Sequence, residues 1–248
     1  EMKAVAALWN SSYVPYLLFF VTSAAWGIGV NQIDKGDVTR LPFPDLDDAR
    51  QARLAAAWDE AAKREEEGAS FPQIRALLDG KVASVLGLRQ AVQTIVSDFF
   101  RIRYQLVKGK SPVELRQPPG EKELRAYATR LRDELDVYLN GAARHRVTII
   151  HGNAGVAVSV ALGRQDKPFD PEIKPATGAT AIALDKVLKS AEAQFSQWAY
   201  VKRSVRLFAG HTVQLVKPPR RMEWSETQAM LDADDIIAEI IENRGKAE

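Results

Sequence analysis

The feature that most constrains the fold is a long uncharged segment near the N-terminus. No side chain between residues 4 and 33 is charged at neutral pH, and residues 17–21 are the most hydrophobic part. An uncharged run of this length is a candidate transmembrane helix. The same pattern also fits a helix that is buried inside a larger fold.

Several residues in and around this segment favour burial in protein. Asn10, Ser11 and Ser12 interrupt the apolar run early, and Pro15 lacks a backbone donor. The glycines that begin at Gly27 are typical of a turn that ends a helix. Charges of both signs flank the segment, so no cationic flank orients it across a membrane, and no signal peptide is evident. We expect a buried helix and no membrane partner, with a membrane-anchored protein as the alternative.

The composition is that of a globular protein with a substantial core. Of the 248 residues, 46% are hydrophobic and 27% are charged, and the length suits one large domain or two small ones. With 34 basic and 32 acidic side chains, the net charge is only +2, so a nucleic-acid site would depend on local clustering. The chain has no cysteine, which excludes disulfides and suits a reducing cytoplasm, the location that we expect.

The first half of the chain is predicted to be helical. Asp47 or Asp48 can cap a helix that ends near residue 67, because both side chains accept hydrogen bonds from free backbone donors. Apolar stripes at helical spacing predict further helices over residues 70–87, 89–107 and 121–139. We therefore place a mainly helical region at residues 1–140.

Beyond residue 140 the apolar residues alternate with a period of two. Residues 146–150 with 156–162, and residues 205–208 with 212–216, predict two β-hairpins. The prolines in residues 163–180 predict a linker or surface loop, and helices are expected over residues 181–198 and 225–241. The predicted fold class is α+β, with a mainly helical N-terminal part followed by a small α+β domain at residues 141–248.

Three groups of short motifs, found in order along the chain, resemble a known family. The first group is Asn10-Ser11, Trp26-Gly27-Ile28 and Leu41-Pro42-Phe43-Pro44. The second is Leu86-Gly87-Leu88 with Ile95-Val96-Ser97-Asp98-Phe99-Phe100. The third is Trp198, Tyr200, Arg203, Arg206, Lys217, Pro218, Trp224, Ser225, Gln228, Ala229, Asp232 and Ala233. Together they resemble the C-terminal, post-catalytic part of N-6 adenine DNA methylases of restriction-modification and phage-defence systems.

The resemblance implies a role in target recognition and scaffolding. Its expected partners are double-stranded DNA and a methyltransferase catalytic domain or subunit, and S-adenosylmethionine is expected on that catalytic part. The Gly-rich turn and the Asn-Pro-Pro-Tyr-type element of the family are absent, and Pro118-Pro119 follows Gln117 instead of Asn or Asp. No catalytic or cofactor-binding residue can therefore be carried over. The chain looks like a fragment or a separate subunit without methyl transfer of its own.

Local groups of cations supply the candidate DNA contacts. They are Arg101, Arg103, Lys108, Lys110 and Arg116 in one stretch, and Lys217, Arg220 and Arg221 in another. Contacts to phosphate would give a steep dependence of affinity on salt. Each group also has a simpler interpretation, as cations at a helix C-terminus or as the rim of a buried Trp224.

Other polar groups give less support for chemistry. Asp232, Asp234 and Asp235 do not converge on one side of a helix, so we expect no metal site. Trp224 should be buried beside a helix capped by Ser225, with Gln228 completing a capping box. Loss of Trp224 should destabilise the domain, whereas loss of Arg220 and Arg221 should weaken DNA binding alone.

The alternative function is an assembly module that docks on a methylase or other defence subunit without contacting DNA.

Overall fold

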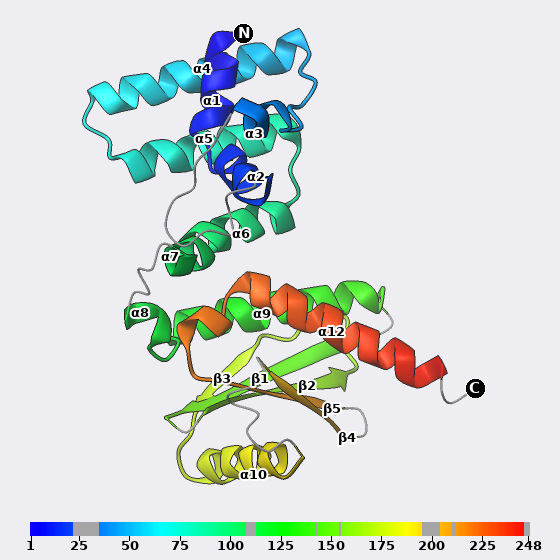
Figure 1. Cartoon of the computed structure of the whole chain (residues 1–248). Helices are drawn as coiled ribbons and strands as arrows, with labels where there is room; N and C mark the ends of the chain where they lie inside the picture. The colour runs from blue at the N-terminus through cyan, green and yellow to red at the C-terminus, as the bar shows by residue number, and fades with distance from the viewer. Residues whose placement is uncertain are drawn as a thin grey trace. The chain divides into compact units, whose positions relative to one another are not determined.

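The chain forms two compact units, Glu1–Ser111 and Pro112–Glu248. The structure is a computed structural model, and it describes residues 1–21, 35–107, 113–141, 143–153, 155–194, 204–209 and 212–245. The first unit, here the helical unit, contains only helices among these residues, and the second, the sheet unit, contains a five-stranded sheet and helices (Figure 1). The predicted α+β class, with two β-hairpins and a C-terminal helix, is confirmed.

The boundary between the units differs from the predicted one at residue 140. Helix α9 (Glu121–Tyr138) belongs to the sheet unit, because its apolar face packs against the strands. Leu124, Tyr127 and Leu131 of this helix are fully buried in one cluster with strand residues. Helical periodicity identifies an apolar face, but it does not reveal which unit that face will join.

The uncharged N-terminal segment begins with two short helices, α1 (Met2–Asn10) and α2 (Tyr13–Val21). Ser11 lies at the corner between them, and its Oγ donates to the Leu8 carbonyl at 2.6 Å. Asp79 of α5 (Phe71–Leu86) accepts hydrogen bonds from the backbone N and the Oγ of Ser12, at 2.5 and 2.7 Å. Among the described residues, no helix combines the length and apolar character needed to cross a bilayer. The predicted turn at residues 26–32 lies outside them.

The two long helices of the helical unit follow the predicted start and stop signals. Asp47 caps the first long helix by accepting from the Arg50 backbone N at 2.7 Å. Ser70 and Gln73 form a capping box at the next, which Gly87 ends in the left-handed conformation at φ 62°. After α2, the helices of the unit are α3 (Lys35–Thr39), α4 (Asp48–Glu66), α5 (Phe71–Leu86), α6 (Gln90–Asp98) and α7 (Tyr104–Val107).

The helix predicted over residues 89–107 is interrupted by a wider turn. Between α6 and α7 lies the π-helical segment η1 (Phe99–Arg103). Phe99 and Ile102 point into the protein, whereas Arg101 and Arg103 are exposed. Such π-turns are uncommon and occur frequently at functional sites.

The sheet unit is built on strands in the order β3-β1-β2-β5-β4. β1 pairs with β2, and β5 with β2 and β4, all antiparallel. Helices α9 and α12 cover one face, and α10 covers the other (Figure 1). The elements are α8 (Val113–Arg116), β1 (Arg144–Gly152), β2 (Gly155–Gly163), β3 (Glu172–Pro175), α10 (Ala179–Gln194), β4 (Val205–Ala209), β5 (Thr212–Lys217), η2 (Arg221–Glu223) and α12 (Glu226–Gly245).

The segment predicted as a loop at residues 163–180 is instead packed on the sheet. It contains β3, which pairs parallel with β1. A Cβ at Gly163 would lie 2.4 Å from the Phe169 ring. The ring therefore packs against the backbone at a position where only glycine fits. The Arg146 guanidinium carbon lies 4.7 Å from the centroid of the same ring.

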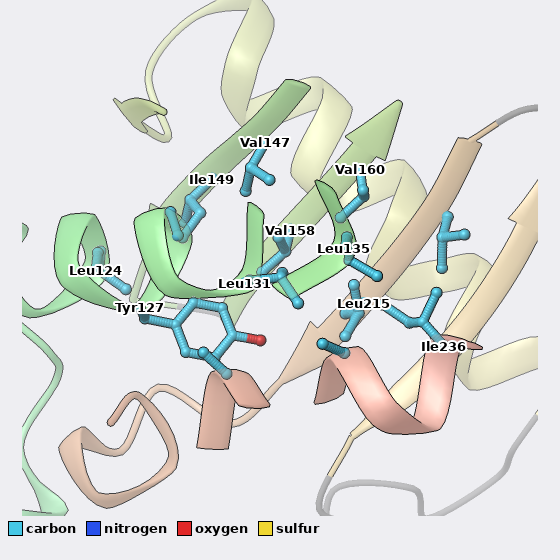
Figure 2. Packing of buried hydrophobic residues seen from close by; sticks show 14 of the residues in the cluster. Leu124, Tyr127, Leu131, Leu135, Val147, Ile149, Val158, Val160, Leu215 and Ile236 are labelled. Carbon is cyan, nitrogen blue, oxygen red and sulfur yellow. The ribbon is translucent and has the colours of Figure 1, made fainter. Parts of the chain in front are cut away.

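The core of the sheet unit lies between the sheet and the α9–α12 layer, where the side chains interdigitate (Figure 2). Trp224 is buried as predicted, with 2% of its surface exposed. Its ring meets Tyr127 edge-on with centroids 5.0 Å apart, and its Nε1 donates to the Pro218 carbonyl at 3.0 Å. Ser225 Oγ accepts from the Gln228 backbone N at 3.2 Å, but Gln228 Oε1 has no hydrogen-bond partner. Only half of the predicted capping box is therefore formed.

Candidate nucleic-acid interface

The predicted DNA-contact residues divide between the two units. Arg101 and Arg103 are exposed on η1 of the helical unit. Arg116, Arg220 and Arg221 belong to the sheet unit, where Arg116 and Arg220 are exposed and Arg221 is half-buried. Lys108 and Lys110 lie outside the described residues.

Lys217 does not belong to this set, because it is sealed inside the sheet unit. Both Lys217 and Asp232 have 0% of their surface exposed, and Lys217 Nζ lies 2.5 Å from Asp232 Oδ2. Tyr127 donates to the same oxygen at 2.6 Å. The ammonium also lies 4.6 Å from the Tyr127 ring centroid and 5.1 Å from that of Trp224. The prediction that Lys217 contacts phosphate is wrong, since α12 supplies a buried counter-charge that the local sequence does not reveal.

The other two cations of this stretch are exposed to different degrees and have acidic neighbours. Arg220 lies 3.5 Å from a carboxylate oxygen of Glu223, and Arg221 Nε lies 3.0 Å from Glu123 Oε1. The second contact lacks hydrogen-bond geometry, since Arg221 Nε remains without a hydrogen-bond partner. These carboxylates offset much of the positive charge that the sequence places here.

A different group of cations lies on η1 and α5 in the helical unit. Arg101 donates to Asp98 at 2.6 Å. Arg103, two residues along η1, is exposed, and within the described parts of the chain no carboxylate forms an ion pair with it. Phe100 directly precedes Arg101 in the sequence, and its ring connects η1 to α5.

That connection is made by Arg75, which sequence analysis did not identify. Its guanidinium carbon lies 4.5 Å from the Phe71 ring centroid and 5.8 Å from that of Phe100. Arg75 Nε has no hydrogen-bond partner, and no ion pair to Arg75 occurs among the described residues. We call Phe71, Arg75 and Phe100 the Arg75 cluster. Phe71 and Arg75 stand four residues apart on a predicted helix, a spacing that could have indicated their contact.

The Arg75 cluster adjoins a larger group of aromatic rings where α2 meets η1. The Phe100 ring lies 5.1 Å from Phe99 and 5.3 Å from Tyr104, measured between centroids. Phe99 in turn contacts the rings of Tyr16, Phe19 and Phe20. Phe20 is 62% exposed, so part of this group faces solvent.

Asp79, one helical turn beyond Arg75, binds Ser12. Burial raises the pKa of Asp79, while the hydrogen bonds from Ser12 and the charge of Arg75 act to lower it. Because both carboxylate oxygens bind Ser12, Asp79 stabilises the α1–α2 corner and does not form an ion pair with Arg75. The Arg75 guanidinium thus keeps donors for a ligand.

The helical unit also contains an apolar cavity of about 370 Å³. The Leu-Pro-Phe-Pro element at residues 41–44 forms one wall, and residues of α1, α2 and α6 form others. Burial, with a smaller contribution from Asp79, raises the pKa of Tyr13 to about 12. The lining residues are Leu8, Tyr13, Val14, Tyr16, Leu17, Leu41, Pro42, Phe43, Pro44, Leu86, Leu88, Val92 and Val96.

A buried histidine in the sheet unit has a structural partner. His145 Nδ1 lies 3.0 Å from Asp136 Oδ1, and the His145 backbone N donates to the same oxygen at 2.7 Å. Burial lowers the pKa of His145, and Asp136 only partly opposes this shift. Within the described ranges, no group of three or more His, Asp or Glu side chains could hold a metal ion.

Comparison with protein-family models, with curated proteins and with solved structures found no match for this chain. The resemblance to adenine methylases therefore stays a prediction, and the candidate site depends on the geometry of the Arg75 cluster and η1.

Proposed function

We propose that this chain is a DNA-recognition and scaffolding segment of an adenine-N6 DNA methyltransferase that acts in the cytoplasm. In this proposal the chain does not itself catalyse methyl transfer, and S-adenosylmethionine binds to the catalytic part. The methylase assignment comes from the motif resemblance. The observation that supports DNA contact is the placement of Arg75 against the Phe100 ring, with Arg101 and Arg103 exposed on the same segment η1.

Guanidinium groups in this arrangement suit the DNA backbone. Their planar donors match phosphate oxygens, and Arg75 and Arg103 need not be separated from an acidic partner when they bind. Arg75 has no ion pair among the described residues, and in the Arg101–Asp98 pair 45% of the arginine side chain is exposed. Sequence-independent phosphate contacts would fix the chain on the duplex, as a scaffolding role requires.

The test is fluorescence anisotropy of a labelled DNA duplex titrated with the full chain. We expect affinity to fall steeply between about 50 mM and about 200 mM salt. Replacing Arg101 and Arg103 together with Ala should weaken binding about tenfold at low salt and reduce the slope of log affinity against log salt by about 2.

The matched control removes two exposed arginines of the same unit, Arg40 and Arg53. This double Ala variant has the same net charge as the Arg101 and Arg103 variant, so it separates local contact from bulk charge. If both double variants bind duplex equally, or if the wild type does not bind at low salt, the proposed DNA contact is wrong.

The second candidate function is the assembly module that does not touch DNA, and the apolar cavity favours it. Phe43 in its wall is 43% exposed and stacks at 6.3 Å on Trp9, so an aromatic surface leads into the cavity. An exposed apolar patch of this kind marks interaction sites.

This candidate is tested by co-expression with an adenine methylase subunit that carries an Asn-Pro-Pro-Tyr element. Phe43→Ser should abolish co-purification and leave duplex affinity unchanged, whereas Met2→Ser, at an exposed residue outside the cavity, should have no effect. Co-purification that survives Phe43→Ser would reject the cavity as the docking surface.

A further inference from the structure

Phe71 presents an exposed aromatic ring on a rigid support. It is the first residue of α5, and 60% of its surface is exposed. The capping box of Ser70 and Gln73 and the early Pro72 fix the backbone beneath it. A ring held in this way loses little conformational freedom when a flat ligand stacks on it.

Arg75 gives the cluster a positive charge next to that ring. The guanidinium lies between the rings of Phe71 and Phe100, at 4.5 and 5.8 Å. A guanidinium that stacks on a ring face keeps its in-plane N–H donors for an anion. The nearest acid along the helix, Asp79, is bound to Ser12.

Phe100 completes the arrangement from the neighbouring helix. Its ring is supported by Phe99 and Tyr104, and the exposed Arg101 and Arg103 follow it along η1. The surface therefore combines aromatic faces with cations over a short span. This combination differs from a patch of cations alone, which can contact phosphates but offers no ring for a base.

We propose that the Arg75 cluster binds an unpaired nucleotide of DNA, with the base stacked on Phe71 and a neighbouring phosphate on the Arg75 guanidinium. The faces of bases are hidden inside a duplex, whereas an unpaired nucleotide exposes them to aromatic side chains. The positive charge of Arg75, Arg101 and Arg103 complements the phosphates on either side. This inference rests on the proposed function in that it specifies the form of DNA that the same surface prefers.

The experiment compares three labelled DNAs of one sequence: a single strand, a perfect duplex and a duplex with a bulge of unpaired bases. Anisotropy titrations with the full chain should give tighter binding to the single strand and the bulged duplex than to the perfect duplex. Phe71→Leu keeps the apolar bulk without the ring, and it should weaken binding to both unpaired DNAs about tenfold or more. Binding to the perfect duplex should change little.

Two further variants distinguish stacking from a structural effect. Phe71→Trp should retain the preference for unpaired DNA, because indole stacks at least as well as phenyl. Phe208→Leu, which alters a comparably exposed ring on β4, should bind all three DNAs like the wild type. A 2-aminopurine in the bulge should be quenched by wild type and Phe71→Trp, but not by Phe71→Leu.

The outcomes separate this inference from the proposed function. Duplex binding that depends on Arg101 and Arg103, with no gain from unpaired bases and no effect of Phe71→Leu, would overturn the inference alone. Absence of binding to all three DNAs would overturn both. A third outcome is that the chain binds no DNA but co-purifies with a methylase subunit, and that Phe71→Leu abolishes this co-purification. The ring would then belong to a protein interface, and the inference would be overturned.

Discussion

The two units differ in how they use their cations. In the sheet unit, Lys217 is buried against Asp232, and Arg206 binds Asp235 and Glu239 at 2.9 and 2.6 Å. In the helical unit, Arg75 lies between two rings and has no ion pair among the described residues. Whether a cation supports the fold or can bind a ligand thus depends on its partners in the structure. The number of cations in a sequence stretch does not decide this.

Replacing Lys217 with Met should produce the largest change, because it leaves Asp232 as an unpaired charge in the core. Removing one member of a buried ion pair costs about 3–5 kcal/mol. Urea unfolding read by pulsed hydrogen exchange should show this loss in the sheet unit and not in the helical unit. The double variant Lys217→Met with Asp232→Leu should regain most of the stability. A single variant as stable as wild type would contradict the contrast between the units.

Trp224→Ala should destabilise the sheet unit by about 3–5 kcal/mol, the usual cost of removing a large buried aromatic ring. Trp224→Phe is the milder control, because it keeps a ring against Tyr127 and loses only the hydrogen bond to the Pro218 carbonyl. Binding of single-stranded DNA should be unchanged in both, since the Arg75 cluster belongs to the other unit. If Trp224→Ala melts like the wild type but loses DNA, the ring is a contact residue and its structural assignment is wrong.

The units should respond to acid in opposite directions. Burial lowers the pKa of His145 below the ordinary 6.5, so the unfolded chain binds this proton more readily and the sheet unit loses stability as pH falls below that value. Burial raises the pKa of Asp79 above the ordinary 3.8, so the folded helical unit takes up this proton first and gains stability as pH falls from neutral towards that value.

Unit-resolved urea titrations at neutral and mildly acidic pH would measure these trends, with the exchange pulse given at one fixed pH. Asp79→Asn should flatten the trend of the helical unit, and His145→Gln should flatten that of the sheet unit. Parallel trends in both units that survive these substitutions would show that other groups dominate.

The smallest effect is expected from replacing Arg220 and Arg221 with Ala together. Their ion pairs with Glu223 and Glu123 are partly exposed, and each such pair contributes about 1 kcal/mol or less. Duplex affinity should fall less than for the Arg101 and Arg103 variant, because nearby carboxylates already offset these charges. A larger loss of affinity would move the main DNA contact to the sheet unit.

The sequence predicted the local boundaries of the helical unit well, because caps are encoded within a few residues. Asp47, Ser70 and Gly87 occupy the predicted positions at helix ends. The assignment of α9 to the sheet unit was missed, since it depends on strands that follow in the chain. Strand β3 was also missed, because it is only four residues long and mostly exposed, so it has no alternating apolar pattern.

The candidate site was only partly predictable for a related reason. Exposure of Arg101 and Arg103 followed from their place at the end of an apolar helix. The burial of Lys217 depends on Asp232, fifteen residues away, across a strand–helix contact that no local pattern encodes. Arg75 was overlooked because its partners are rings, and a search for runs of charge does not detect a single cation between aromatic side chains.

The wide turn of η1 has a consequence for how this surface could change during evolution. A π-turn accommodates one residue more than an α-turn, and each residue of an α-helix advances about 100° around the axis. Each side chain after η1, beginning with Tyr104, therefore points in about the direction that the preceding residue would take in an unbroken helix. Deleting one residue within 99–103 would let the helix close into regular turns without rotating the later side chains, because the wide turn already absorbs the extra residue. The change would therefore be confined to the turn itself, where Phe100, Arg101 and Arg103 would take new directions.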